Sequence, residues 1–121
     1  MTRYLLNSPI VAIPPEDREA IIYVKKLTLE EAREWAKGDF ISAIGHESTA
    51  LMLTSLLGVD VPVNRIRISL KEGDEALVTQ FLVRPPEGKI WSLRELEQLW
   101  REGKIQFLLL VRLPMGHSSP N

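Results

Sequence analysis

The feature that most constrains the fold is an almost uninterrupted apolar run near the end of the chain. Residues 105–111 read Ile-Gln-Phe-Leu-Leu-Leu-Val. A strand with one solvent-exposed face alternates apolar and polar side chains. A strand that is apolar on both faces must have other parts of the protein packed against both faces. The run is therefore predicted to lie in the interior of a sheet or at an interface with a partner.

Other strand signals precede this run. Arg3–Leu6, Ile21–Lys25 and Ala76–Arg84 are predicted strands, and Phe40–Ile44 is either a short strand or an irregular segment. Val63–Leu70 alternates strictly, with Arg65 and Arg67 on one side, which predicts a half-buried strand with a basic face. The turn Glu72-Gly73-Asp74 then predicts that Ala76–Arg84 returns as its antiparallel partner.

Three helices are predicted between the strands. Thr28 with Glu31, and Ser92 with Glu95, have the spacing of a capping box, in which side chain and backbone at a helix start bond each other. The first helix is expected to end at Gly38 and the last near Gly103. A further apolar helical segment runs from Ala50 to Leu57 and is ended by Gly58.

Composition sets the class of the protein. The chain has 121 residues, of which 45% are hydrophobic and 26% charged, as in an ordinary globular domain. We therefore expect a single α/β domain over residues 1–113, with a mixed sheet of about five strands and helices packed on it. Residues 114–121 are rich in Gly, Ser and Pro and are predicted to form a disordered tail.

Charge and cysteine content exclude several functions. A formal net charge of −1 argues against coating DNA or RNA, so no DNA partner is expected. The absence of cysteine excludes disulfides and thiolate metal sites, and it suits a reducing cytosol. No segment approaches the ~20 apolar residues of a membrane span, and no signal peptide is evident. We expect a cytoplasmic protein with no membrane contact and no metal or other cofactor.

His46 is the leading candidate for chemistry. It precedes the helical segment Ala50–Leu57, while the other histidine, His117, lies in the predicted tail. Imidazole exchanges protons near neutral pH, Gly45 lets backbone approach closely, and a helix start offers free N–H groups to an anion such as phosphate. The segment predicts a proton donor beside a phosphate seat, although a lone histidine is more often structural.

The neighbouring candidates each have a plainer interpretation. Glu47 and Ser48 suit the first turn of any helix. Arg65 and Arg67 are either a solvated surface or a bidentate phosphate site. Arg84 and Glu87 flank Pro85-Pro86, which is either a rigid strand exit or a preset loop offering a cation and a carboxylate. The tryptophans fall in or beside predicted helices, which favours packing over base stacking; they are Trp35, Trp91 and Trp100.

Several short motifs, taken in order, resemble the viral type III anti-CRISPR ring nucleases and their cellular relatives. Each motif is weak, but their order and spacing from Tyr4 to Val111 are specific together. They are Tyr4-Leu5-Leu6-Asn7, Ala43-Ile44-Gly45-His46-Glu47-Ser48-Thr49, Asn64-Arg65, Glu72-Gly73-Asp74-Glu75-Ala76-Leu77, Arg84-x-x-Glu87-Gly88-Lys89 and Gly103-Lys104-Ile105-Gln106-Phe107.

The resemblance implies an α/β homodimer that binds cyclic tetra-adenylate and cleaves it to linear di-adenylates without metal, which silences type III CRISPR signalling. If the chain is viral, its expected location is the cytoplasm of the host cell. His46 corresponds to the family's catalytic histidine, and Arg65, Arg84 and Glu87 to its other site residues. Asn7, Gly45, Glu47 and Ser48 are expected to line the substrate site. Relatives often carry a hydroxyl residue where this chain has Pro9-Ile10, so Ser8 is the expected substitute.

The chemistry implied needs few groups. When the RNA 2′-OH attacks the adjacent phosphate, the leaving 5′-oxygen needs a proton, which His46 can supply, and the charge on phosphorus needs cations, which Arg65 and Arg84 can supply. No strong base is evident, so substrate geometry is expected to activate the 2′-OH. Two alternatives stay open: a non-catalytic cyclic oligonucleotide sensor or sponge, and a structural domain that buries residues 105–111 against a partner.

Overall fold

The computed structural model describes residues 1–115, so His117 and the predicted tail from residue 116 onward lie outside the described residues. Strands and helices alternate along most of this part of the chain. In order they are β1 (Arg3–Leu6), β2 (Ile21–Leu27), α1 (Leu29–Ala36), β3 (Ile41–Ser42), α2 (Glu47–Leu57), β4 (Glu75–Phe81), α3 (Leu93–Arg101) and β5 (Ile105–Leu113).

The described strands form one mixed five-stranded sheet in the order β2-β5-β4-β1-β3. β1 runs parallel to both β3 and β4, whereas β5 is antiparallel to β4 and β2. The apolar run is thus an interior strand, and the α/β class with a mixed sheet and packed helices is confirmed.

The predicted strand over Val63–Leu70 is wrong. This segment pairs only through isolated bridges, at Val63 with Ile44 and at Ser69 with Ala12. Both edges of β4 are taken by β1 and β5, so no edge is left for an antiparallel partner from this segment. The alternation arises because Ile68 and Leu70 pack onto the sheet while Arg65 and Arg67 face outward.

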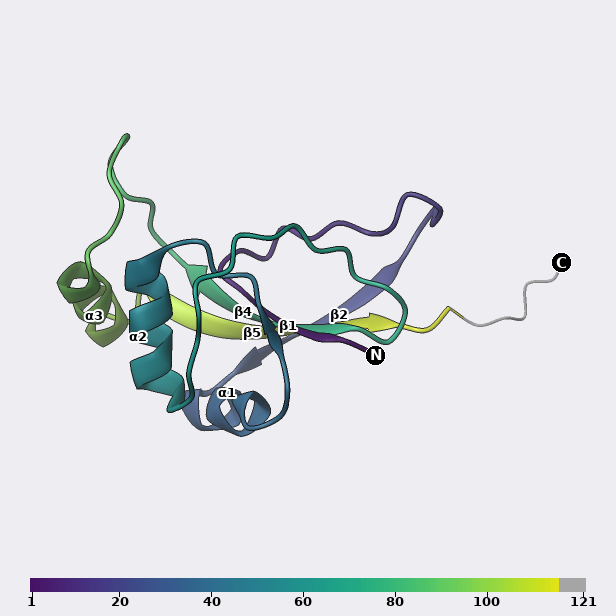
Figure 1. Cartoon of the computed structure of the whole chain (residues 1–121), viewed down its shortest axis with the longest axis horizontal. Coiled ribbons are helices and arrows are strands. Elements are labelled where there is room, and N and C mark those ends of the chain that lie inside the picture. Colours follow the sequence, from purple (N-terminus) through teal and green to yellow (C-terminus); the bar gives the residue numbers. More distant parts are fainter. Residues whose placement is uncertain (116–121) are drawn as a thin grey trace, which may run out of the picture.

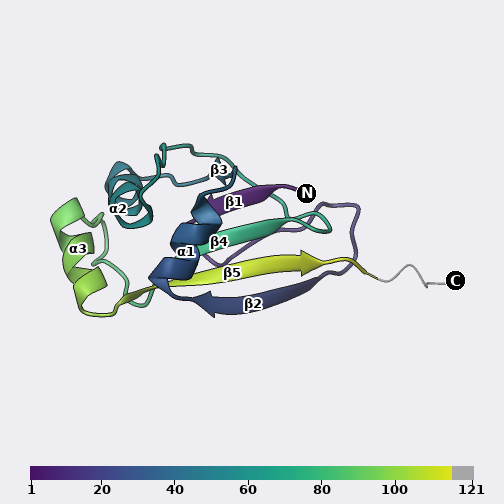
Figure 2. The same cartoon turned by 90° about the horizontal axis from the view of Figure 1, so that it is seen from below.

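Different elements cover the two faces of the sheet (Figures 1 and 2). The three helices pack over one face, where Leu5, Leu77 and Phe107 are buried beneath them. Figure 2 shows α1 lying across the sheet, with α2 and α3 gathered at one end. On the other face, two long loops bring Val11 and Ile68 onto a smaller core. No described helix is long and apolar enough to cross a membrane.

The helix starts differ in a way that matters for the site. Both predicted capping boxes are present: the Thr28 hydroxyl accepts from the Glu31 N–H at 3.1 Å, and the Ser92 hydroxyl accepts from the Glu95 N–H at 3.2 Å. α2 instead begins at Glu47, earlier than the predicted Ala50, with His46 as its N-cap. The His46 side chain makes no capping hydrogen bond.

Candidate functional site

The carboxyl ends of the three parallel strands meet at one edge of the sheet. Asn7 follows β1, Gly45 and His46 lie a few residues after β3, and the loop of residues 82–92 follows β4. In open α/β sheets, ligands bind outside the carboxyl ends of the strands, because connections diverge there and leave a crevice. Asn7 and His46 in fact line a common hollow.

His46 is held at the N-terminus of α2 with its ring free of the helix. Its backbone is extended, at φ −125° and ψ 135°, and its carbonyl accepts the first helical hydrogen bond from Ala50 N–H at 3.0 Å. The side chain is half-buried rather than packed in the core. The imidazole is therefore fixed at its base, open to a ligand, and close to the positive end of an 11-residue helix.

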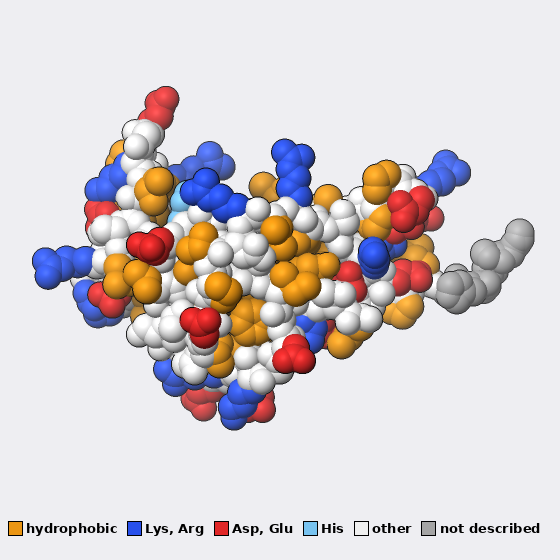
Figure 3. Space-filling view, viewed as in Figure 1, with side chains coloured by type: hydrophobic (Ala, Val, Ile, Leu, Met, Phe, Trp, Pro, Cys, Tyr) orange, Lys and Arg blue, Asp and Glu red, His pale blue; other side chains and the backbone are white. Residues whose placement is uncertain are grey.

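We call the space in front of this ring the histidine hollow. It has a volume of about 490 Å³ and is wide open to solvent. Lys and Arg side chains gather along this side of the molecule, around the histidine (Figure 3). The hollow therefore combines one imidazole, one amide and two guanidinium groups in a setting that suits an anion. It is lined by Asn7, Ala43, Gly45, His46, Arg65, Ile66 and Arg67.

Arg65 is positioned from two directions. Its Nε donates to the carbonyl of Gly45 at 2.8 Å, and a Cβ built on Gly45 would lie 3.4 Å from its Cγ. Asn64 anchors the segment, because its backbone N–H donates to Ile44 at 2.8 Å and its amide donates to Ser42 at 2.7 Å. Within residues 1–115, the two terminal nitrogens of Arg65 have no hydrogen bond, so they are available to phosphate oxygens.

Two of the predicted site residues stand apart from this hollow. Arg84 and Glu87 lie on the 82–92 loop, are exposed, and do not line the histidine hollow. In Figure 1 this loop rises from the body of the molecule beside the start of α2. Glu47 is exposed in the first turn of α2 and lies outside the lining as well.

The two predicted serines have partners within the protein. The Ser48 hydroxyl donates to the carbonyl of Trp91 at 2.7 Å, which ties the start of α2 to the end of the 82–92 loop. The Ser8 hydroxyl accepts from the N–H of Ile10 at 3.2 Å and so shapes the turn after β1. Both side chains therefore fix the surroundings of the histidine hollow.

Two further spaces adjoin the histidine hollow. The first, which we call the aliphatic hollow, measures about 550 Å³ and shares Asn7, Ala43, Ile66 and Arg67 with it. The second, which we call the aromatic cavity, measures about 210 Å³ and shares Asn7 and His46. The aromatic cavity is lined by Asn7, His46, Thr49, Phe81, Pro85, Lys89, Ile90 and Trp91.

Sequence reasoning missed Phe81, Lys89 and Trp91 as site residues. Trp91 does pack against the core, as predicted, but it also lines the aromatic cavity. Lys89 bonds the Glu95 carboxylate, and this contact, followed by the Ser92 N–H, holds the pKa of Glu95 below its ordinary value. No local signal marks these side chains, because the cavity forms only when the 82–92 loop folds against α2.

Comparisons with known proteins agree with this architecture. A family model described as STIV B116-like matches residues 3–109. Among solved structures, B116 of Sulfolobus turreted icosahedral virus is similar, with a TM-score of 0.67 and 30% identity over 91% of this chain and 98% of that one.

Relatives occur in viruses and in a bacterium. Uncharacterized protein 26 of Sulfolobus islandicus filamentous virus is 46% identical over 98 residues, which is 79% of this chain and 82% of that protein. Uncharacterized protein YddF of Bacillus subtilis is 34% identical over 111 residues, 89% of this chain and 94% of that protein. The relatives are thus viral and cellular, as expected, and the chain belongs to the STIV B116-like family.

Proposed function

We propose that this protein is a metal-independent ring nuclease that binds cyclic tetra-adenylate and cleaves it to linear di-adenylates. The observation that carries the proposal is His46, whose unbonded ring faces a hollow that also contains Arg65 and Arg67. A proton donor beside two guanidinium groups is the set of groups that cleavage of an RNA phosphodiester requires. The ordered motifs that resemble the anti-CRISPR ring nucleases support the same substrate.

The proposed step uses the substrate's own nucleophile. The ribose 2′-hydroxyl releases its proton to solvent water as its oxygen bonds to the adjacent phosphorus, and the bond from phosphorus to the 5′-oxygen breaks. His46, as imidazolium, gives its proton to that 5′-oxygen, and the guanidinium groups stabilise the charge on the phosphoryl oxygens. The products are a 2′,3′-cyclic phosphate and a 5′-hydroxyl. General acid catalysis contributes about 10²–10⁴-fold, so positioning and electrostatics supply the remainder.

A homodimer completes the proposal. A two-fold axis would present two copies of His46 to opposite phosphates of a four-membered ring, so that two cuts release two di-adenylates. Arg84 and Glu87, on the exposed 82–92 loop, are proposed to contact the bound ring from outside the histidine hollow. Removal of the cyclic messenger would silence the effector nucleases that it activates.

The test is incubation with cyclic tri-, tetra- and hexa-adenylate in EDTA, with the products analysed by mass. We expect the native chain to convert the tetra-adenylate to linear di-adenylates, and His46→Ala to bind the ring but cut it at least 10²-fold more slowly. Lys37→Ala, at the exposed C-cap of α1, is the matched control and should cut at the native rate.

The other outcomes identify the alternatives. Binding of an intact ring by the native chain would make the protein a sensor or sponge, in which His46 only donates a hydrogen bond to phosphate. Failure to bind any ring would contradict the proposal and favour a structural or protein-interaction domain. Loss of binding in His46→Ala, with cutting merely slowed, would contradict the role of His46 as the acid.

A further inference from the structure

We propose that the aromatic cavity is a base-binding subsite, which takes the purine of the nucleotide whose phosphate lies at His46. The proposal deepens the function proposed above and rests on it for the identity of the nucleotide. The cavity lies between the start of α2, the end of β4 and the 82–92 loop.

Position is the first argument. The aromatic cavity and the histidine hollow share Asn7 and His46, so the two spaces adjoin at the imidazole. Base, ribose and phosphate follow one another within a nucleotide. A phosphate seated against Arg65 in the histidine hollow therefore brings its own nucleoside to the mouth of the aromatic cavity.

Size is the second argument. Pockets that enclose a whole drug-sized ligand measure about 300–1,000 Å³. The aromatic cavity, at about 210 Å³, is too small for a cyclic oligonucleotide but suits a single ring system. The ring of phosphates and riboses would then stay in the wider, open histidine hollow.

Chemistry is the third argument. Phe81 and Trp91 supply aromatic surfaces, and Pro85 and Ile90 supply apolar edges, which together suit the flat face of a base. The aliphatic hollow, by contrast, is lined by side chains such as Val11, Ile66 and Ile68, and no aromatic residue is among them. Of the two spaces beside the histidine hollow, only the aromatic cavity offers stacking.

The indole of Trp91 adds a specific donor. Its Nε1 is buried and has no hydrogen-bond partner among the described residues. Buried polar atoms are nearly always bonded, so an orphaned one asks for an explanation. The ribose of a nucleotide whose base stacks on the indole lies beyond the ring edge, and its oxygens are acceptors that would satisfy this N–H.

The experiment measures tryptophan fluorescence of the full chain during titration with adenosine monophosphate, and separately with cytidine monophosphate. A purine stacked on Trp91 should quench the emission more strongly than the smaller pyrimidine does. Trp91→Phe should lose this quenching, because the signals of Trp35 and Trp100 then remain alone. The same variants are titrated with cyclic tetra-adenylate in a His46→Ala background, where the ring is not consumed.

We expect Trp91→Leu to weaken binding of the ring about tenfold to a hundredfold, since stacking of a base on an aromatic side chain is lost. Trp91→Phe is the matched control, because it keeps an aromatic face, and should weaken binding only a few-fold. Circular dichroism verifies folding, and if Trp91→Leu is unfolded, the quenching of the native chain by adenosine monophosphate decides alone.

The outcomes separate this proposal from the function on which it rests. Tight binding of the ring that is unchanged in Trp91→Leu, with no quenching by adenosine monophosphate, would overturn the subsite and leave the nuclease intact. Quenching by the purine, without binding or cutting of the ring, would support the subsite and remove cyclic tetra-adenylate as its ligand. Absence of both quenching and ring binding would overturn the two proposals together.

Discussion

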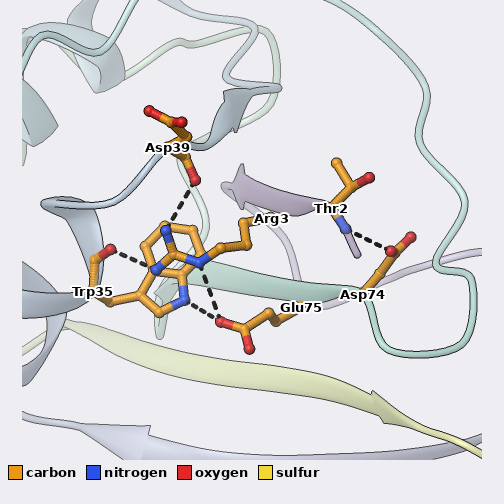
Figure 4. A network of polar contacts seen from close by, with 6 residues as sticks. All are labelled: Thr2, Arg3, Trp35, Asp39, Asp74 and Glu75. Atoms are coloured by element: carbon orange, nitrogen blue, oxygen red, sulfur yellow. Dashed lines mark hydrogen bonds and ion pairs between the residues drawn. The ribbon is translucent and has the colours of Figure 1, made fainter.

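Two arginines at opposite ends of the parallel strands show how the protein treats the same side chain in different ways. Arg3 lies at the amino end of β1, in the network of Figure 4, and Arg65 lies beyond the carboxyl ends. Both have guanidinium groups that bond to backbone carbonyls. They differ in how many guanidinium nitrogens still lack a hydrogen-bond partner within the described residues.

Each nitrogen of the Arg3 guanidinium has a hydrogen-bond partner. Its three nitrogens donate to the Glu75 carboxylate at 3.4 Å, the Asp39 carbonyl at 2.9 Å and the Trp35 carbonyl at 2.6 Å. Its central carbon lies 4.0 Å from the centre of a Trp35 ring, whose N–H donates to Glu75 at 2.7 Å. Figure 4 shows these groups converging on one another from β1, α1 and β4.

Arg65 is fixed at one atom only. Its Nε is bonded to Gly45, while the terminal nitrogens point to no described acceptor and the side chain is exposed. Guanidinium nitrogens without internal partners contribute little to folding. They can form bidentate hydrogen bonds to phosphate without first breaking internal ones. The comparison leads us to expect the larger contribution to stability at the amino ends of the strands, and it supports the proposed ligand site at their carboxyl ends.

The largest expected effect is that of removing the Arg65 side chain. Arg65→Ala should reduce cleavage of cyclic tetra-adenylate by about 10²–10³-fold, as loss of one donor to a developing charge does elsewhere. Because the side chain is exposed, the free energy of unfolding should change by no more than about 0.5 kcal/mol. Single-turnover cleavage and urea unfolding measure the two quantities. A destabilised variant that cuts at the native rate would reverse the assignment.

Arg3→Ala should show the opposite behaviour. It removes three hydrogen bonds, to the Glu75 carboxylate and to two backbone carbonyls, together with the stacking on Trp35, so we expect the free energy of unfolding to fall by about 2–3 kcal/mol. At a temperature where the variant is folded, cleavage should be within a few-fold of the native rate. Chemical denaturation and the cleavage assay check this, and an equal loss in both variants would remove the distinction between the two ends.

The sequence predicts those features of the fold and of the candidate site that depend on local pattern. The capping boxes at Thr28 and Ser92, and the interior position of residues 105–111, follow from short-range chemistry and periodicity. His46 is recognisable because it follows Gly45 and stands just before a helical segment, while the other histidine falls in the predicted tail. In each case, the residues that decide the structure are neighbours in the chain.

The missed features all depend on contacts between distant segments. Val63–Leu70 alternates like a strand, but the edges of β4 are already occupied, and only the fold reveals this. The network around Arg3 joins residues 32–72 positions apart, and the aromatic cavity joins Asn7 to Trp91. No periodicity reports such pairings.

A matched pair of glycine substitutions sharpens the comparison further. A Cβ on Gly38 would meet Nη1 of Arg3, whose guanidinium cannot move without losing its bonds, whereas a Cβ on Gly45 would make ordinary contact with Arg65. We expect Gly38→Ala to cost about 1–2 kcal/mol through overpacking, and Gly45→Ala to cost less than about 0.5 kcal/mol. Thermal unfolding checks both, and equal costs would mean that Arg3 yields as easily as Arg65.

The smallest expected effect is a pH dependence of stability, which comes from carboxylates at the starts of α1 and α3. Hydrogen bonds hold the pKa of two capping carboxylates below their ordinary value: the backbone N–H of Thr28 acts on Glu31, and Lys89, followed by Ser92 N–H, acts on Glu95. A carboxylate with a lowered folded-state pKa stabilises the fold above its unfolded pKa of about 4.3, and this stabilisation is lost as the pH falls through the folded value.

Glu95→Gln isolates this effect, because glutamine keeps the shape of the cap without its charge. The melting temperature of the variant should lie below that of the native chain at pH 7, and the gap should close as the pH falls below about 4. Thermal melts across that range measure it. Glu95 also bonds Lys89, which lines the aromatic cavity. Titration of the same variant with cyclic tetra-adenylate therefore tests whether this contact contributes to binding of the ring. A gap that widened in acid would show that the carboxylate is not stabilised by its partners.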